Sequence, residues 1–592
     1  MTELAAVAPR VRSRLPRAVL PFAALFVLGV ALPLTGNEYW GIIATRAAIY
    51  WVLVSGLNLV VGYAGQLAIG YVSLLTLGAY TTAVLCQRFG LPMVPALAAG
   101  GAVGAVFGVL VGLPALRLRT FYFAMATLGF ATIVTQVALA WTDVTGGGVG
   151  VAGPTLPAPF DTPWGFYFAC FAAAAVCTWL TANIAHSRFG RGLVAIRDAE
   201  VAAEAYGVSK PGLFMAVFLF SGAVAGVAGG LFADLQSYIT PDAFTFDLSV
   251  LFFIAILVGG RNSILGPLLA TILLTILPEI AAPLVAWSTF LYATLLLVIV
   301  VAVPGGIADL LDLGNRRPLE RDRAVVPRPA LLTAALPDRA HGPPLAIESI
   351  RLSFGGLRAI DDLTLDLHAG EVHGLIGPNG SGKTTTLNVI CGFATPQQGR
   401  IVLGGRVLPL GEPRSRAAHG IARTFQTPRI IGEVSVLDNV MIGGTISGTA
   451  SFAEAMLSLP RQRRDEVELR ERAMLALCTI GLEGLAAVRC DRLQHSELRF
   501  LEIARALMLR PDFLLLDEPA AGLSAEEIRH LAALVRGICA RGTGVLLVEH
   551  HADLIFDLCD RVTVLNLGRV LAAGTPAEIR AHREVVSAYL GG

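Results

Sequence analysis

Acidic side chains are almost absent from the long apolar runs that fill residues 18–303. A carrier driven by a proton gradient usually needs Asp, Glu or His within its membrane spans. The scarcity of these residues argues against proton-driven transport and indicates that any transport energy comes from another source.

The chain also lacks cysteine pairs, since its eight cysteines form neither a CxxC pattern nor a metal-ligand spacing. We expect reduced cysteines that pack as small apolar side chains and face a cytosol. No small-residue cleavage site follows the first apolar run, residues 19–34, and more apolar runs come after it. These features argue against a cleavable signal peptide.

Apolar sequence is in excess. Hydrophobic residues make up 55% of the 592 residues, and the mean hydropathy is +0.66, whereas a soluble domain is usually about 45–50% apolar. The excess lies within residues 18–303, and residues 345–592 have the composition of an ordinary cytosolic domain. The net charge of +1 averages over both parts and therefore says little about partners. We expect no nucleic-acid partner.

Seven stretches in the N-terminal part are long enough to cross a bilayer, which takes about 20 apolar residues. They are residues 18–34, 41–61, 66–86, 93–115, 121–141, 164–185 and 211–235. Basic clusters precede the first and fifth stretches and separate the sixth from the seventh. If each stretch crosses once, all three clusters lie on one side, which the positive-inside rule makes the cytoplasm.

Residues 304–344 separate the two parts and contain seven prolines and six arginines without apolar periodicity. This composition predicts an extended, polar linker. About 40 flexible residues span roughly 35 Å, which is enough to place a separate domain beneath the membrane part. The arginines also favour contact with anionic membrane lipid.

A glycine-rich loop, GPNGSGKT at residues 377–384, follows the apolar run 371–376 and precedes a helical pattern. This order of strand, loop and helix is the context of a P-loop, whose backbone N–H groups surround phosphates. Lys383 would reach the β- and γ-phosphates, and Thr384 would hold Mg²⁺. The loop therefore predicts ATP and Mg²⁺ as its ligands. The binding residues are Gly377, Asn379, Gly380, Ser381, Gly382, Lys383, Thr384 and Thr385.

Two carboxylates end a second apolar run, residues 513–516. A buried strand does not end in two acids without a use. Asp517 suits a Mg²⁺ contact, and Glu518 suits a base that positions the attacking water. His550 follows the apolar run 545–548, where it could reach a γ-phosphate. Alone it would be interpreted as a core histidine, but Lys383 and Glu518 favour a catalytic role.

An ATP-using domain and the N-terminus must both be cytoplasmic, so the number of membrane crossings must be even. The last apolar stretch, residues 248–303, is broken at 259–262 and at 278–279. Three short crossings there would give ten segments in total. One crossing with a re-entrant pair would give eight.

Residues 345–592 resemble an ABC transporter ATPase on these motifs. The resemblance implies that Phe354 stacks on adenine and that Lys383, Glu518 and His550 act in ATP hydrolysis. It also implies a Mg²⁺ site formed by Thr384, Gln426 and Asp517. The loop at 521–523 would cross to a partner subunit.

The signature loop of this family, usually Leu-Ser-Gly-Gly-Gln, corresponds to Leu493, Gln494, His495, Ser496 and Glu497. Both glycines are replaced, and Glu497 adds negative charge where a phosphate is expected. Ser496 also adds a side chain where backbone must approach the ligand. We therefore expect this degenerate loop to weaken the ATP site that it completes.

The apolar part carries a second set of motifs. They are GLNLVVG at 56–62, LRLR at 116–119, TLGF at 127–130, TGG at 145–147, FTF at 244–246, GG at 259–260, SILG at 263–266 and LPE at 277–279. In this order they resemble the permeases of bacterial high-affinity branched-chain amino-acid uptake systems. Residues 197–207, with Arg197, Glu200, Ala203 and Gly207, look like the coupling loop that such permeases insert into their ATPase.

Together these features predict an all-α membrane domain at 1–303, the linker at 304–344 and an α/β P-loop ATPase at 345–592. We expect ATP-driven import of branched-chain or related small amphipathic amino acids across a bacterial inner membrane. Import of amides or urea is an alternative, and short cytoplasmic loops disfavour an exporter or flippase. The resemblance implies three partners: a second permease, a second ATPase and a periplasmic solute-binding protein.

Overall fold

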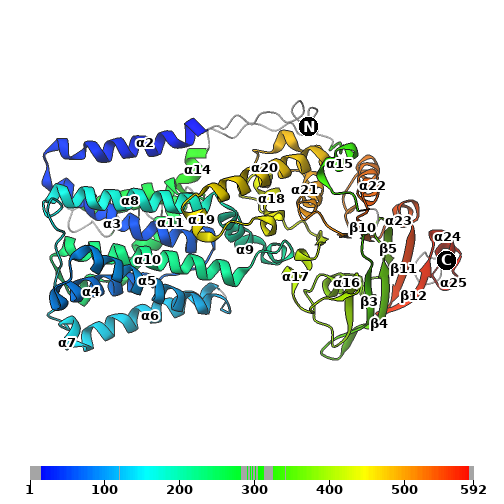
Figure 1. Ribbon diagram of the computed structural model, residues 1–592, viewed down its shortest axis with the longest axis horizontal. Coiled ribbons are helices and arrows are strands. Elements are labelled where there is room, and N and C mark those ends of the chain that lie inside the picture. Colours follow the sequence, from blue (N-terminus) through cyan, green and yellow to red (C-terminus); the bar gives the residue numbers. More distant parts are fainter. Residues whose placement is uncertain are drawn as a thin grey trace. The chain divides into compact units, whose positions relative to one another are not determined.

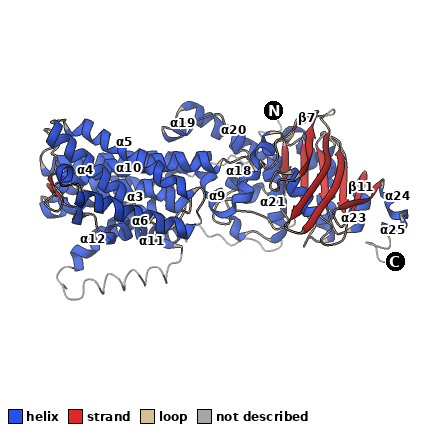
Figure 2. Cartoon of the chain, turned by 90° about the horizontal axis from the view of Figure 1, so that it is seen from below, coloured by secondary structure: helices blue, strands red, loops and turns tan. Residues whose placement is uncertain are grey.

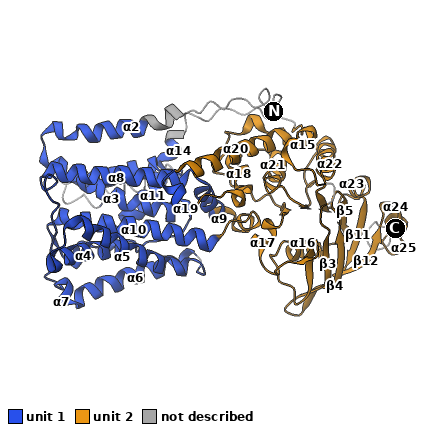
Figure 3. Ribbon diagram, viewed as in Figure 1, with its two compact units in different colours: residues 1–197, 210–318, 452–458 blue, residues 198–209, 319–451, 459–592 orange. Residues whose placement is uncertain are grey.

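The computed structural model describes residues 15–118, 120–281, 305–312, 325–339 and 342–585, with isolated positions at 290, 294, 297 and 301 (Figure 1). Strands are few in the N-terminal part and gather in the C-terminal part (Figure 2). Two compact units emerge (Figure 3). Unit 1 comprises residues 1–197, 210–318 and 452–458, and unit 2 comprises residues 198–209, 319–451 and 459–592.

Six helical segments of unit 1 are long and apolar enough to cross a membrane, among the residues that the structure describes. They are α3 (Glu38–Asn58) continued by η2 (Leu59–Tyr63), α5 (Met93–Ala115), α6 (Thr120–Ala140), α8 (Pro163–Ala185), α10 (Lys210–Gln236), and Pro241–Gly259, which includes η3 (Pro241–Ala243) and α11 (Phe246–Gly259). Other helices are α2 (Leu15–Ala31), η1 (Leu32–Thr35), α4 (Val72–Phe89), α7 (Thr142–Thr145), α12 (Leu265–Ala281) and α14 (Gly306–Asp312). Strands β1 (Val151–Ala152) and β2 (Tyr238–Ile239) pair antiparallel.

Every predicted span overlaps a helix. The third span begins later than predicted, at Val72, because a turn with Gly65 at φ 69° precedes α4. The predicted break at 259–262 separates α11 from α12. Most of the apolar sequence after α12 falls outside the described residues, so the choice between eight and ten crossings stays a prediction.

Glycines allow α5 and α10 to pack with their backbones in contact. A Cβ on Gly104 would clash with the carbonyl oxygen of Gly222, and a Cβ on Gly226 would clash with that of Gly100. Small residues permit such close approach between membrane helices, where van der Waals packing stabilises association. These glycines therefore have a packing role.

Helix α9 (Arg188–Ala205) bends where the chain passes from one unit to the other. Ala199 has non-helical angles, φ −149° and ψ 61°. Just before the bend, Arg197 donates from Nη1 to the carbonyl oxygen of Gly62, at 2.6 Å, within unit 1. Residues 198–209, just after Arg197, belong to unit 2.

Unit 2 contains a six-stranded sheet in the order β12-β11-β5-β10-β9-β8 and a four-stranded sheet in the order β4-β3-β6-β7. The central strands β5, β9 and β10 are parallel and buried along their whole length, which explains their continuous apolar sequence. The strands are β3 (Leu345–Phe354), β4 (Leu357–Leu367), β5 (Val372–Ile376), β6 (Gln398–Leu403), β7 (Arg406–Val407), β8 (Ile421–Arg423), β9 (Phe513–Asp517), β10 (Gly544–Val548), β11 (Arg561–Asn566) and β12 (Arg569–Gly574).

Helices accompany these sheets in unit 2. The α-helices are α15 (Leu332–Ala335), α16 (Lys383–Ile390), α17 (Pro413–Ala418), α18 (Val436–Gly443), α20 (Pro460–Ile480), α21 (His495–Leu507), α22 (Ala525–Cys539), α23 (Ala552–Leu558), α24 (Pro576–Ala581) and α25 (Arg583–Val585). The 3₁₀ turns are η6 (Pro329–Leu331), η7 (Thr445–Ser447), η8 (Glu483–Leu485) and η9 (Cys490–Arg492).

Residues 325–339 lie inside the range predicted as an extended linker, yet they pack within unit 2. Leu332 and Leu336 are 1% and 3% exposed. The backbone N–H of Arg328 donates to the carbonyl oxygen of Thr479 at 2.7 Å, and its guanidinium lies 2.9 Å from Glu483. This part of the range is therefore not a free connector, because apolar burial and hydrogen bonds hold it in place.

A short segment of the C-terminal half belongs to unit 1. Helix α19 (Phe452–Met456) packs there against α8. The rings of Phe452 and Phe189 lie 5.3 Å apart, and Asn183 donates from Nδ2 to the carbonyl oxygen of Met456 at 2.9 Å. This segment was not predicted from the sequence.

Candidate ATP site

Parallel pairing brings the predicted phosphate-binding and acidic residues to one edge of the six-stranded sheet. Val548 lies opposite both Asp517 and Leu375 in the ladder. Loops that follow parallel strands therefore emerge together at their carboxyl ends, where ligands bind in open α/β sheets. The P-loop, Glu518 and His550 begin from this common edge.

The backbone of the P-loop adopts positive φ angles, which its glycines allow. Gly380 and Gly382 adopt φ 79° and 103°, and a Cβ on Gly380 would meet open space. Lys383 is 6% exposed, and its Nζ donates to the carbonyl oxygens of Gly377 and Pro378 at 2.7 and 3.0 Å. Burial lowers the pKa of Lys383, while the nearby Glu518 and Asp517 raise it. Asn379 and Thr384 are exposed, and Thr385 is half-buried.

Glu518 joins two residues that lie far from it in sequence. Its Oε2 accepts a hydrogen bond from Nε2 of Gln426 at 2.9 Å, and its Oε1 lies 2.8 Å from Nε2 of His550. The backbone of Glu518 has φ 49°, a left-handed conformation that is uncommon outside glycine and concentrates at functional sites. These contacts hold the Glu518 carboxylate in a defined orientation at the sheet edge.

Asp517 and Ser381 leave buried oxygens without partners among the described residues. Asp517 is 2% exposed, and its Oδ2 accepts from Nη2 of Arg423 at 2.9 Å, while Oδ1 has no hydrogen-bond partner. Oγ of Ser381, 1% exposed, also has none. Burial raises the pKa of Asp517, and Arg423 opposes that shift. An unpaired carboxylate oxygen and an unpaired hydroxyl beside a P-loop are suited to contact Mg²⁺ and a phosphate.

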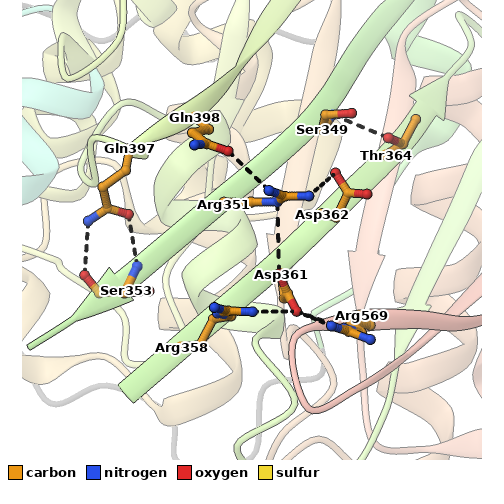
Figure 4. Close-up of polar contacts among 10 residues, drawn as sticks. All are labelled: Ser349, Arg351, Ser353, Arg358, Asp361, Asp362, Thr364, Gln397, Gln398 and Arg569. Atoms are coloured by element: carbon orange, nitrogen blue, oxygen red, sulfur yellow. Dashed lines mark hydrogen bonds and ion pairs between the residues drawn. The ribbon is translucent and has the colours of Figure 1, made fainter. Parts of the chain in front are cut away.

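Phe354 ends β3 with 57% of its surface exposed, as a ring that stacks on a base requires. A polar network braces the strands beside it (Figure 4). Asp361 contacts Arg358 at 3.1 Å and Arg569 at 2.8 Å. The N–H of Asp361 donates to Gly568, whose N–H in turn donates to Ser381. This network therefore links β4 and the β11–β12 turn to the P-loop.

The degenerate signature residues lie at the start of α21. Oε2 of Glu497 accepts the backbone N–H of Gln494 at 2.8 Å, within a capping box at the helix N-terminus. Ser496 is 8% exposed, and Leu493 packs partly buried against the core. His495 is exposed, and its Nε2 lies 3.2 Å from the carbonyl oxygen of Ala521, which follows the Glu518 strand. The signature loop and the 521–523 loop of this cassette are therefore neighbours.

The predicted coupling residues divide between the units. Arg197 belongs to unit 1, whereas Glu200, Ala203 and Gly207 belong to unit 2. Ala203 is 1% exposed. Gly207 has φ 82°, and a Cβ there would lie 2.6 Å from Cδ1 of Ile446. The segment 198–209 is thus packed into the cassette.

The individual roles of three buried polar residues of the site were not predicted from the sequence. Arg423 pairs with Asp517, and Tyr206 is 0% exposed. Glu549 accepts the N–H of Ala520 at 2.6 Å and that of His550 at 3.1 Å, so it joins the loop after β9 to the loop after β10. A charged residue within or directly after an apolar strand was the available signal for Arg423 and Glu549. Tyr206 had none.

Comparison with known proteins agrees with this geometry. Residues 40–303 match the family described as branched-chain amino acid transport system, permease component. Residues 360–521 match the ABC transporter family, and residues 569–592 match a branched-chain amino acid ATP-binding cassette transporter family.

Curated relatives match the cassette over nearly their whole length. The high-affinity branched-chain amino acid transport ATP-binding protein LivG of Salmonella typhimurium is 39% identical over 42% of this chain and 98% of its own length. BraF of Pseudomonas aeruginosa, with the same description, is 37% identical over the same shares. A crystal structure of a nucleotide-free ATP-binding cassette from an ABC transporter shares 31% identity over 42% of this chain and all of its own, with a TM-score of 0.38.

These matches cover both parts of the chain. The helical part is a membrane permease domain, and the α/β part is an ATPase whose hydrolysis is coupled to transport. The chain therefore belongs to the branched-chain amino-acid family of ABC transporters and joins a permease component and an ATP-binding component in one polypeptide.

Proposed function

We propose that the chain drives import of branched-chain amino acids across a bacterial inner membrane, with its N-terminus and cassette on the cytoplasmic side. The observation that carries the proposal is the presence in one chain of a branched-chain amino-acid permease match at 40–303 and a LivG-like cassette. The cassette supplies the energy that the apolar spans, poor in acids, cannot take from protons.

ATP hydrolysis would use the residues gathered at the sheet edge. Lys383 binds the β- and γ-phosphates, and Phe354 stacks on the adenine ring. Glu518, oriented by Gln426 and His550, accepts a proton from the attacking water. Thr384, Gln426 and Asp517 would hold Mg²⁺, which neutralises charge on the phosphates when bound.

The working assembly would contain two permease domains and two cassettes, because ATP sites in this family form between cassettes. We propose a different permease and a different ATPase as the other pair, together with a periplasmic solute-binding protein. Anionic lipid would contact the arginines near the membrane.

Uptake in the cell that produces the chain tests this proposal. The gene is deleted and restored as wild type or as Glu518→Gln, and uptake of radiolabelled leucine, isoleucine and valine is compared with that of acetamide and urea. We expect loss of leucine, isoleucine and valine uptake on deletion, with rescue by the wild type only. Unchanged uptake of all three, with loss of acetamide or urea uptake, would assign the chain to amide or urea import instead.

A further inference from the structure

Arg423 bridges two elements of the ATP site from a buried position at the end of β8. The residue is 3% exposed. Its Nη1 donates to Oδ1 of Asn388 at 2.6 Å, and its Nη2 donates to Oδ2 of Asp517 at 2.9 Å. Asn388 lies on α16, the helix that begins at Lys383. The guanidinium therefore joins the P-loop helix to the acidic end of β9.

This bridge fixes one oxygen of Asp517 and leaves the other available. Oδ1 of Asp517 has no partner among the described residues, as noted above. A buried ion pair adds little net stability, because removing both charges from water costs nearly what their attraction returns. A planar, two-ended donor is, however, well suited to orient a carboxylate. Orientation of Asp517 is thus the better explanation for this arginine.

Segment 198–209 contacts the main chain of the same arginine. The hydroxyl of Tyr206 donates to the carbonyl oxygen of Arg423 at 3.3 Å. The ring of Tyr206 lies 4.7 Å below the guanidinium of Arg505, which donates to the carbonyl oxygen of Arg429 at 2.7 Å. A fully buried tyrosine with a partner for its hydroxyl and a cation on its face has a defined position. Displacement of this segment would therefore act on Arg423.

We propose that Arg423 is a positioning residue that presents Asp517 to Mg²⁺, and that Tyr206 lets segment 198–209 adjust this presentation. This inference rests on the proposed ATP-driven transport. It connects the predicted coupling segment with the carboxylate that would bind Mg²⁺. The route runs from Tyr206 through the carbonyl of Arg423 to its guanidinium and then to Oδ2 of Asp517.

Metal-dependent nucleotide binding tests the proposal without turnover. The full-length chain in lipid nanodiscs is titrated with a fluorescent ATP analogue, first in EDTA and then over a range of buffered free Mg²⁺. In Arg423→Gln we expect nucleotide affinity in EDTA to stay within about twofold, while the Mg²⁺ midpoint rises about tenfold. Tyr206→Phe, which keeps the ring, should raise the midpoint about two- to fivefold.

Two further variants keep the test decisive. Arg423→Gln leaves Asp517 buried without its cation and could unfold the cassette. Asn388→Ala removes only the other anchor of the guanidinium, at a half-buried position, and should raise the Mg²⁺ midpoint in the same direction. Arg400→Gln, at an exposed position of strand β6, serves as the arginine control and should leave the midpoint unchanged.

An unchanged Mg²⁺ midpoint in folded Tyr206→Phe and Asn388→Ala would overturn the proposal. Equal weakening of nucleotide binding in EDTA and in Mg²⁺ would also overturn it, because that pattern indicates a structural role. Failure of branched-chain amino-acid uptake with a shifted midpoint would instead reject the proposed substrate and leave the role of Arg423 intact.

Discussion

Nε2 of His550 lies 2.8 Å from Oε1 of Glu518, and Gln426 donates to the other oxygen of the same carboxylate. We expect Glu518→Gln to stop hydrolysis, because an amide keeps the size and removes the base. Turnover at this site should fall about 10²–10⁴-fold, with nucleotide affinity unchanged. Phosphate release and equilibrium binding measure the two effects.

The matched control for that change is Glu526→Gln at the exposed start of α22. It should leave both quantities unaltered. If Glu518→Gln retains full turnover in the assembled transporter, the partner cassette alone drives the cycle.

Lys383→Ala should act on binding rather than on chemistry alone. The ammonium is buried beside the P-loop carbonyls, and its removal takes away the cation that faces the β- and γ-phosphates. We expect the dissociation constant for ATP to rise about tenfold or more, as measured by isothermal titration. An ATP affinity equal to that of Glu518→Gln would contradict this role.

The signature loop predicts two unequal ATP sites. Glu497 already places a carboxylate on the N-terminus of α21, where a phosphate of the opposite site would otherwise bind. Ser496→Gly with Glu497→Gln should therefore increase turnover at the partner's P-loop. Glutamine can still cap the helix, so the fold should tolerate the change.

ATP turnover of the assembled complex measures this effect, alone and after removal of the partner's catalytic glutamate. Should the restored loop change nothing, and loss of the partner's glutamate be as damaging as loss of Glu518, the two sites are equivalent.

His373 on β5 makes the stability of the cassette depend on pH. It is 3% exposed, and burial lowers its pKa from 6.5 to about 4. As pH falls, the unfolded chain therefore binds the proton at a higher pH than the folded chain does. The stability that neutral His373 contributes is complete above pH 6.5 and is lost as pH falls toward 4. The loss amounts to roughly 3 kcal/mol. His373→Gln, which can keep the bond to Thr563, should flatten this part of a stability profile recorded by thermal unfolding.

The packed part of the linker should stabilise the cassette. Leu332 is buried against α22, where its Cδ1 lies near Gly537. Leu332→Ala should cost about 2–5 kcal/mol locally and accelerate hydrogen exchange in α20 and α22. Thr333→Ala, at the neighbouring exposed position, should change exchange little. Equal exchange in both variants would mean that the contact contributes nothing.

Much of the fold and of the ATP site could be predicted from local motifs. The P-loop, the two acids of β9 and His550 each follow an apolar strand, and parallel pairing then brings such strand ends together without further information. The helices of unit 1 could be predicted because a bilayer demands about 20 apolar residues in one stretch. For these elements, the residue types within one short stretch of sequence were sufficient for the prediction.

Long-range contacts could not be predicted in this way. Tyr206 and Arg423 are 217 residues apart, and one tyrosine in the turn after α9 gives no sign of its partner. The linker was interpreted from its prolines and arginines, and the two leucines that become buried, Leu332 at the start of α15 and Leu336 directly after it, were overlooked. Burial of those two leucines depends on surfaces of α20 and α22 that only the folded cassette presents.

Residues 325–339 also change where the cassette begins as a folding unit. The ATPase motifs suggest a start at Leu345, yet His530 lies 3.0 Å from the carbonyl oxygen of Val325, and Arg541 donates to that of Leu336. A recombinant cassette cloned from residue 345 would lose these acceptors and expose the apolar surface beneath the two leucines. Constructing a soluble fragment, or swapping the cassette between transporters, therefore requires a junction upstream of Val325.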